Sequence, residues 1–164
     1  TELSHDENFT KNYTLKLADT YNYTYVAMNM KPDGKTHQKL FDDLLVRKAM
    51  ALLTPYEQIN KTLYENHNKR VVCPISPNKL DFNTDLKPVE YNVTKAKDLL
   101  KQAGWADTDN DQILDKVIDG KKVKFEFAIN FLSGSKVWED LAKQLAESMN
   151  KANIYAMLNP LDYN

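Results

Sequence analysis

Two residue types are scarce in this chain of 164 residues: cysteine occurs once and glycine four times. A single cysteine excludes a disulfide framework and a cysteine zinc site within one chain, and Cys73 is interpreted as a small buried apolar residue. With four glycines, the sequence has no glycine-rich phosphate loop and neither nucleotide-binding fingerprint. The three histidines show no metal-ligand spacing, and no serine lies in a nucleophile elbow. The sequence therefore offers no catalytic constellation, and we do not expect an enzyme.

An excess of one charge and long hydrophobic runs are absent as well. The formal net charge is −1, without a long run of either sign, so the chain has no electrostatic footprint for nucleic acid or for an anionic membrane surface. No stretch approaches the roughly 20 apolar residues that a membrane span needs. Hydrophobic residues make up 42% and charged residues 27%, which is ordinary for a globular protein. The length suffices for one domain with a hydrophobic core.

Hydrophobic periodicity in the N-terminal half predicts a strand followed by two helices. Alternating side chains predict a strand at residues 21–30, and a spacing of three and four predicts a helix at residues 41–53. The buried face of that helix is expected to carry Leu44, Leu45, Ala49, Leu52 and Leu53. A second helix is expected to begin at Thr54, with Glu57 completing a capping box. Residues 71–89 have several prolines and little periodicity, and are interpreted as an extended loop.

The C-terminal part of the chain predicts a strand, a helix and a strand in succession. Residues 123–131 alternate strictly between apolar and mostly polar positions. Residues 133–135 cap the helix, which is expected to turn Val137, Leu141, Leu145 and Met149 inward. Residues 154–158 form the closing strand. This spacing indicates a βαβ crossover, which favours parallel pairing, so the expected fold class is mixed α and β (α/β).

The most informative stretch is residues 92–115, NVTKAKDLLKQAGWADTDNDQILD. Asn92 can cap a helix by accepting hydrogen bonds from its first free N–H groups. Apolar residues three and four positions apart then form one face, and they are Ala96, Leu99, Leu100 and Ala103. Gly104 stands where a helix usually ends in the left-handed conformation. Trp105 follows at once and is placed to fold back over the last turn.

An acidic loop follows this helix. Asp107, Asp109, Asp111 and Asp115 fall at the first, third, fifth and ninth positions of a calcium-loop pattern. The sixth position is Gln112, where a glycine would ease the turn, and the twelfth is Ile118, where a bidentate glutamate belongs. An EF-hand is therefore not expected. Two interpretations stay open: a weak structural calcium site, and a solvated turn stabilised by aspartate side chains.

Three segments resemble, in the same order, the extracellular solute-binding proteins of bacterial ABC importers for peptides, nickel and related solutes (family 5). The first joins residues 25–29 to residues 40–49, where an acidic pair and Arg47 follow a tyrosine-rich segment. The second is the helix and acidic loop at 92–115, and the third runs from 125 to 158. Together they cover most of residues 20–160. Two positions depart from the family's pattern, since Asn153 and Gln112 stand where it usually has glycine.

The resemblance implies that the chain is one part of a longer receptor. Family members have two lobes that close over a ligand, in a periplasmic binding protein type II-like fold, and this chain resembles the first portion of the second lobe. We therefore expect residues 1–164 to be a single domain excised from that lobe, with the first lobe and a lipoprotein segment elsewhere in the full-length protein. The expected location is the periplasm or the cell surface. The expected partners are a peptide or small-molecule ligand and an ABC permease in the membrane, and not nucleic acid.

The resemblance also implies which residues contact ligand. The tyrosine-rich segment would run near the cleft between the lobes, and the turn at Ser133 with the following helix start would line the cleft wall. Tyr23, Tyr25, Ser133 and Trp138 are therefore the candidate ligand-binding residues. An open helix N-terminus nearby would attract a ligand carboxylate. Arg47 is given a structural role instead, tying its helix to a neighbouring loop.

The leading hypothesis is a substrate-binding component of an ABC transporter, which captures oligopeptides or a related small solute by hinge closure. The alternative is a stand-alone, calcium-stabilised extracellular interaction module, which the acidic loop suggests. Family members take peptides, nickel complexes, sugars or haem-like molecules, so the ligand stays open. No cofactor is expected apart from the weak structural calcium.

Overall fold

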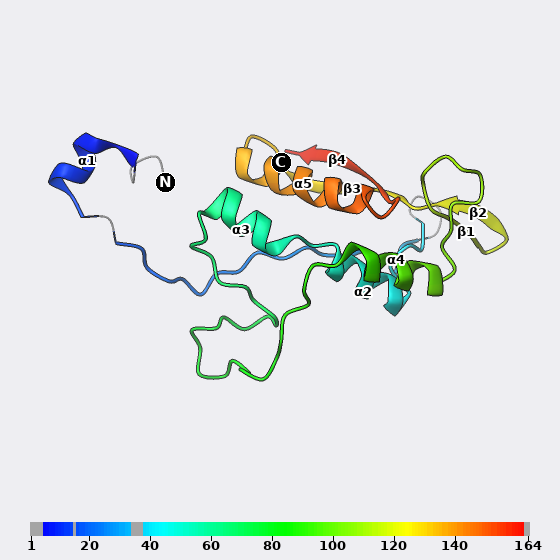
Figure 1. Ribbon diagram of the computed structural model, residues 1–164, viewed down its shortest axis with the longest axis horizontal. Helices are drawn as coiled ribbons and strands as arrows, with labels where there is room; N and C mark the ends of the chain where they lie inside the picture. The colour runs from blue at the N-terminus through cyan, green and yellow to red at the C-terminus, as the bar shows by residue number, and fades with distance from the viewer. Residues whose placement is uncertain (1–4, 15, 34–37, 163–164) are drawn as a thin grey trace. The chain divides into compact units, whose positions relative to one another are not determined.

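The computed structural model describes residues 5–14, 16–33 and 38–162 (Figure 1). The chain divides into two compact units: the first comprises Thr1–Tyr25 and Val71–Leu86, and the second comprises Val26–Arg70 and Lys87–Asn164. Within the described ranges, no helix combines the length and the apolar character needed to cross a membrane. The prediction that residues 1–164 are one domain excised from a second lobe concerns the full-length protein, and it stays a prediction.

The first unit is mostly irregular. Helix α1 (Glu7–Asn12) begins where the carboxylate of Asp6 accepts hydrogen bonds from the backbone N–H groups of Asn8 and Phe9. This helix buries none of its residues. The loop predicted at residues 71–89 is confirmed, since it contains no helix and no strand.

The strand predicted at residues 21–30 is wrong: no residue of this segment joins a strand pair. Alternating side chains suit a segment to a sheet, but a strand also needs a neighbouring backbone to exchange hydrogen bonds with. The strands among the described residues pair with one another, and none of them pairs with this segment. Its side chains are exposed except that of Met28, which is half-buried.

Three helices open the second unit, and they are α2 (Leu44–Leu52), α3 (Tyr56–Tyr64) and α4 (Val93–Gln102). Helix α2 begins later than predicted, because the carboxylate of Asp43 accepts a hydrogen bond from the N–H of Leu45 (2.7 Å) and so caps it. Arg47 donates from Nη1 to the carbonyls of Phe41 and Asp42, each at 2.8 Å. These two bonds tie α2 to the preceding loop, which confirms the structural role of Arg47.

Two details of these helices differ from the predictions. Leu44, expected on the buried face of α2, is 55% exposed, whereas Val46 and Met50 are buried. The buried face is the one that packs against α4, a neighbour distant in sequence. The capping box at Thr54 does not form either, because the Thr54 hydroxyl donates to the Met50 carbonyl (3.1 Å) and Pro55 precedes α3 without a side-chain cap. A carbonyl four residues earlier competes successfully for such a hydroxyl.

Helix α4 confirms the prediction at both ends. The side chain of Asn92 accepts a hydrogen bond from a backbone N–H of the first turn (2.8 Å). At the other end Gly104 has φ +85°, its N–H donates to the carbonyl of Lys101, and the N–H of Trp105 donates to the carbonyl of Leu100, both at 3.0 Å. This pair of bonds is a Schellman motif, which satisfies the last carbonyls of the helix and turns the indole back over it.

The remaining elements are β1 (Asp115–Ile118), β2 (Lys121–Lys124), β3 (Glu126–Leu132), α5 (Lys136–Asn150) and β4 (Tyr155–Leu161). Strands β1 and β2 form an antiparallel hairpin, turned by Asp119 and Gly120, which both have positive φ. Strands β3 and β4 pair in parallel along their whole length and are joined by α5. The predicted βαβ unit with parallel pairing, and with it the mixed α and β fold class, is confirmed.

The strand predicted at residues 123–131 is divided into β2 and β3 at Phe125. The N–H of Phe125 donates to the carbonyl of Leu114 (2.7 Å), while its carbonyl accepts from the N–H of Tyr155 (3.0 Å). At this fully buried residue the backbone thus changes its hydrogen-bonding partner from Leu114, which precedes β1, to Tyr155 of β4. Alternation continues across this point because the core lies on the same side of both strands, so sequence periodicity alone does not show the break.

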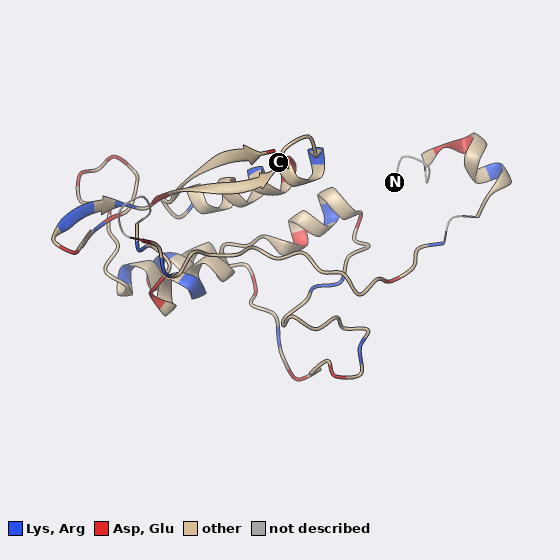
Figure 2. Ribbon diagram, turned by 180° about the vertical axis from the view of Figure 1, so that it is seen from behind, with Lys and Arg blue, Asp and Glu red and all other residues tan. Residues whose placement is uncertain are grey.

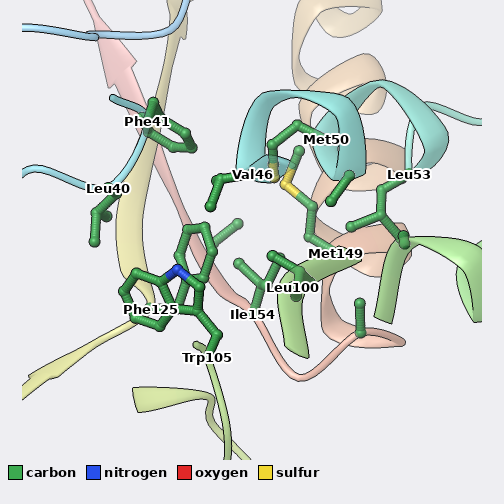
Figure 3. Close-up of a cluster of buried hydrophobic side chains, with 14 of the residues drawn as sticks. Leu40, Phe41, Val46, Met50, Leu53, Leu100, Trp105, Phe125, Met149 and Ile154 are labelled. Atoms are coloured by element: carbon green, nitrogen blue, oxygen red, sulfur yellow. The ribbon is translucent and has the colours of Figure 1, made fainter. Parts of the chain in front are cut away.

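The core of the second unit lies between α2, α4, α5 and the strands (Figure 3). Trp105 packs against Phe125, with ring centroids 4.4 Å apart. Helix α5 turns Leu145 and Met149 into this core as predicted, whereas Val137, in its first turn, is 41% exposed. The fully or nearly fully buried residues include Val46, Leu53, Ala96, Leu100, Phe125, Ala152 and Ile154.

Candidate functional site

An open groove lies where the parallel strands end and α5 begins. The sheet places Phe131 of β3 opposite Pro160 of β4. The chain then turns through residues 133–135 into α5. The groove has a volume of about 490 Å³ and is lined by Phe131, Ser133, Gly134, Ser135, Lys136, Glu139, Leu158 and Pro160. In open α/β sheets, ligands bind outside the carboxyl ends of the parallel strands, so this groove is the candidate site.

The turn at one end of the groove is held to the end of β4. The N–H of Ser133 donates to the carbonyl of Leu161 (2.9 Å), and the Ser133 hydroxyl is hydrogen-bonded to the carboxylate of Asp162. Gly134, with φ +75°, allows the chain to reverse. Ser135 precedes α5 without capping it through its side chain. The first N–H groups of α5 therefore receive no hydrogen bond from the cap residue's hydroxyl.

The charges at the rim of the groove are balanced. The Lys136 ammonium lies 2.5 Å from a carboxylate oxygen of Asp140, and Glu139 forms an ion pair with Lys143. The hydrogen bond from Lys136 to Asp140 raises the pKa of Lys136, and the hydrogen bond from Lys143 lowers the pKa of Glu139. Both rim residues thus stay ionised and each has a partner of opposite charge.

The four predicted ligand-binding residues do not gather at one place within either unit. Ser133 lines the groove, while Trp138 is half-buried in the first turn of α5 and is not part of the lining. Tyr23 and Tyr25 belong to the first unit, with their ring centroids 6.0 Å apart and 44% and 73% of their surfaces exposed. Ligand contact by these four residues stays a prediction.

Sequence reasoning missed three apolar residues of the groove. Phe131, Leu158 and Pro160 come from two strands distant in sequence, and their side chains share the face of the sheet that also carries the buried Ala156. The available signal was the alternation of β3 and β4 combined with their parallel register, which places residues 131 and 160 side by side. Alternation alone predicts that such residues are covered by a helix, whereas Leu158 is 39% exposed.

The acidic loop brings three of its four predicted aspartates together. Carboxylate oxygens of Asp107, Asp109 and Asp115 lie within 4.8 Å of one another. The ammonium of Lys122, in β2, lies 2.9 Å from a carboxylate oxygen of Asp109 and 3.2 Å from one of Asp115. Asp111 is not a member of this group of three carboxylates, and it pairs with Lys124, which also belongs to β2. The hairpin lysines and the loop aspartates lie side by side (Figure 2).

Asp115 is the buried member of the cluster. Burial acts to raise its pKa, but hydrogen bonds from the backbone N–H and hydroxyl of Thr108, together with Lys122, outweigh burial and hold the pKa below its ordinary value. Asp107 accepts hydrogen bonds from the backbone N–H groups of Asp111 (3.2 Å) and Gln112 (3.0 Å). The loop is therefore ordered by its own aspartates, and the carboxylate of Asp115 is ionised at neutral pH.

The two positions that depart from the family's glycines both have positive φ. Gln112 has φ +70° and Asn153 has φ +61°. The side-chain amide of Asn153 donates to the carbonyl of Gln112 (2.9 Å), so the two strained positions are bonded to each other. Glycine would adopt such backbone conformations without steric cost, which explains why the family pattern has it there.

Comparison with known proteins identifies the family. Residues 3–164 match the description "Bacterial extracellular solute-binding proteins, family 5 Middle". The chain belongs to this family. It is 36% identical over 134 residues to the oligopeptide-binding protein AppA of Bacillus subtilis, a match that covers 80% of this chain and 23% of AppA. The chain thus spans about a quarter of that relative's length, and the relatives are solute-binding proteins rather than enzymes.

Solved structures of family members share this fold. The structure of AppA from Bacillus subtilis in complex with a nonapeptide matches with a TM-score of 0.69 and 35% identity, over 76% of this chain and 24% of that one. The oligopeptide-binding protein of Thermus thermophilus, complexed with a pentapeptide, matches with a TM-score of 0.68 and 27% identity, over 73% and 20%. NikZ of Campylobacter jejuni, in complex with Ni(L-His), matches with a TM-score of 0.62 and 28% identity, over 74% and 24%. The predicted family and fold class are confirmed.

Proposed function

We propose that this chain is part of the substrate-binding component of an ABC transporter that captures oligopeptides for import. The observation that carries the proposal is the match to AppA, which is named for oligopeptide binding and was solved with a nonapeptide. The groove supports it, because it lies at the carboxyl ends of parallel strands, where α/β proteins bind ligands. No catalytic step is part of the proposed mechanism: the ligand is held by backbone hydrogen bonds and side-chain contacts while the receptor closes.

The proposed partners and location follow from the same family. A first lobe elsewhere in the full-length protein would complete the binding cleft, and an ABC permease would receive the ligand. The family's description as extracellular supports a periplasmic or cell-surface location, and we propose anchoring as a lipoprotein. The contacts proposed for Tyr23, Tyr25, Ser133 and Trp138 belong to this mechanism.

The test is ligand binding by the full-length gene product that contains these residues. Isothermal titration with a pentapeptide and a nonapeptide should give saturable binding, and titration with nickel and L-histidine should give none. Binding of the nickel complex without binding of peptide would contradict the oligopeptide proposal and move the ligand class toward that of NikZ. An immunoblot of source cells provides a second check, since the proposal expects a band several times larger than 18.9 kDa.

We also propose, as a second candidate, that the acidic loop takes a weak structural calcium ion. The observation that favours it is the cluster of Asp107, Asp109 and Asp115. The Lys122 ammonium competes with a cation there, because it already pairs with two of these carboxylates. A gene product near 18.9 kDa that calcium stabilises would favour the stand-alone interaction module over the transport receptor.

Calcium binding is tested by thermal unfolding with and without the ion. A concentration ten times the dissociation constant should add about 1.4 kcal/mol to the free energy of unfolding and raise Tm. Asp109→Ala should abolish the rise, and Lys122→Met should enlarge it by removing the competing charge. An unchanged Tm in both the wild type and Lys122→Met would contradict the calcium proposal.

A further inference from the structure

We propose that the groove at the end of β3 and β4 binds an apolar side chain of the peptide ligand, and that Phe131, Leu158 and Pro160 determine this preference. The inference rests on the proposed function and adds to it the class of ligand side chain and the residues that select it. The observations that carry it are the composition of the groove floor, its position in the sheet and the pairing of the charges at its rim.

The floor of the groove is the less covered part of one apolar face of the sheet. The parallel register aligns residues 127, 129 and 131 of β3 with 156, 158 and 160 of β4. Ala156, at the start of this face, is 7% exposed, whereas Leu158, further along, is 39% exposed. Parallel strands are normally covered on both faces. The apolar surface near the strand ends is thus less covered than the start of the face and is open to a ligand.

The rim does not favour a charged side chain. Lys136 is paired with Asp140 and Glu139 with Lys143, so an incoming lysine or glutamate would have to compete with an existing ion pair. The hydroxyl of Ser133 is already bonded to Asp162. An apolar side chain breaks none of these bonds and gains the burial of its own surface against the floor.

The size of the groove suits this ligand. Its volume of about 490 Å³ lies within the range of roughly 300–1,000 Å³ that is usual for small-molecule sites. The opposite face of the same sheet also exposes apolar side chains, among them Met157 at 44% and Leu161 at 47%. Neither of these lines the groove, so that face supplies a matched control.

The experiment measures dissociation constants of the full-length gene product for pentaalanine and for pentapeptides in which one alanine is replaced by leucine, phenylalanine, lysine or glutamate, at each position in turn. At one position, leucine or phenylalanine should tighten binding about tenfold or more relative to alanine, and lysine or glutamate should not. Leu158→Asp should remove most of this gain, because it places a carboxylate in the apolar floor of the groove.

The control variant is Met157→Asp, the neighbouring residue of the same strand on the opposite face, which should keep the full gain. Equal circular dichroism spectra and melting temperatures of the two variants show that both are folded. If no peptide of any composition binds the wild-type protein, the proposed function itself is overturned. If peptides bind without an apolar preference, or with one that Leu158→Asp leaves unchanged, the function stands and the inference about the groove is overturned.

Discussion

Gly104 is the residue on which the end of α4 depends, and Gly104→Ala is the sharpest test of that statement. The residue has φ +85°, and the two N–H groups that follow the helix close the Schellman motif only with the backbone in this conformation. The motif places Trp105, which is 2% exposed, against Phe125 in the core. A side chain at Gly104 therefore strains the backbone directly before Trp105, a residue of the core.

The cost of Gly104→Ala can be worked out from its surroundings. A Cβ added to Gly104 would lie 3.4 Å from Cε of Lys116, which is ordinary van der Waals contact with a flexible side chain. The substitution therefore lowers the free energy of unfolding almost entirely because alanine, an L-residue, must adopt the left-handed conformation, which costs about 1–2 kcal/mol. For a chain of this length, such a loss lowers Tm by about 2–8 °C.

Urea unfolding followed by circular dichroism and by tryptophan fluorescence measures this loss. Gly104→Asn is the matched variant, because asparagine tolerates the left-handed region better than alanine, and it should lose less stability. If Gly104→Ala unfolds at the same urea concentration as the wild type, or if Gly104→Asn is the less stable of the two, the explanation by backbone strain is refuted.

Three further predictions concern the stability of the second unit. Ser148→Ala removes the buried hydroxyl that donates to the carbonyl of Leu53 at 2.6 Å, and should lower the free energy of unfolding by about 1–3 kcal/mol in a chemical denaturation experiment. Gln112→Gly relieves a residue at φ +70°, and should raise the melting temperature by an amount equivalent to about 1 kcal/mol; a decrease would show that the side chain contributes more than the strain costs. The hydrogen bond from Lys124 lowers the pKa of Asp111 in the folded state. The stabilisation by this pair is therefore fully present above the pKa of an unfolded aspartate, about 3.9, and is lost as the pH falls through the lower pKa of the folded state. Denaturation between pH 6 and pH 2 in the wild type and in Asp111→Asn should show a smaller acid-induced loss in the variant, and equal losses would contradict the assignment.

The candidate site was predictable only in part. Ser133 was identified through the family resemblance, and the structure places it in the lining of the groove. Leu158 and Pro160 could not be assigned to the groove from their own segment, because only the parallel register of β3 and β4 places them beside Phe131. The acidic loop was also predictable only in part. The spacing of the aspartates indicates the cluster, whereas the hairpin of β1 and β2 places Lys122 between Asp109 and Asp115.

What the sequence determined by itself was local. The cap at Asn92, the stop at Gly104 and the return of Trp105 follow from bonds between residues at most six positions apart, and all three are present. Features that depend on contacts between segments distant in the sequence were set by the tertiary structure. Residues 21–30 alternate like a strand but have no partner strand among the described residues, and the regular pattern around Phe125 divides where the backbone changes neighbours. The pattern of side chains shows which face of a segment is apolar. Whether the segment forms a strand, and which residues line a groove, depends on the backbone segment that lies beside it. That neighbour is fixed only when the whole chain has folded.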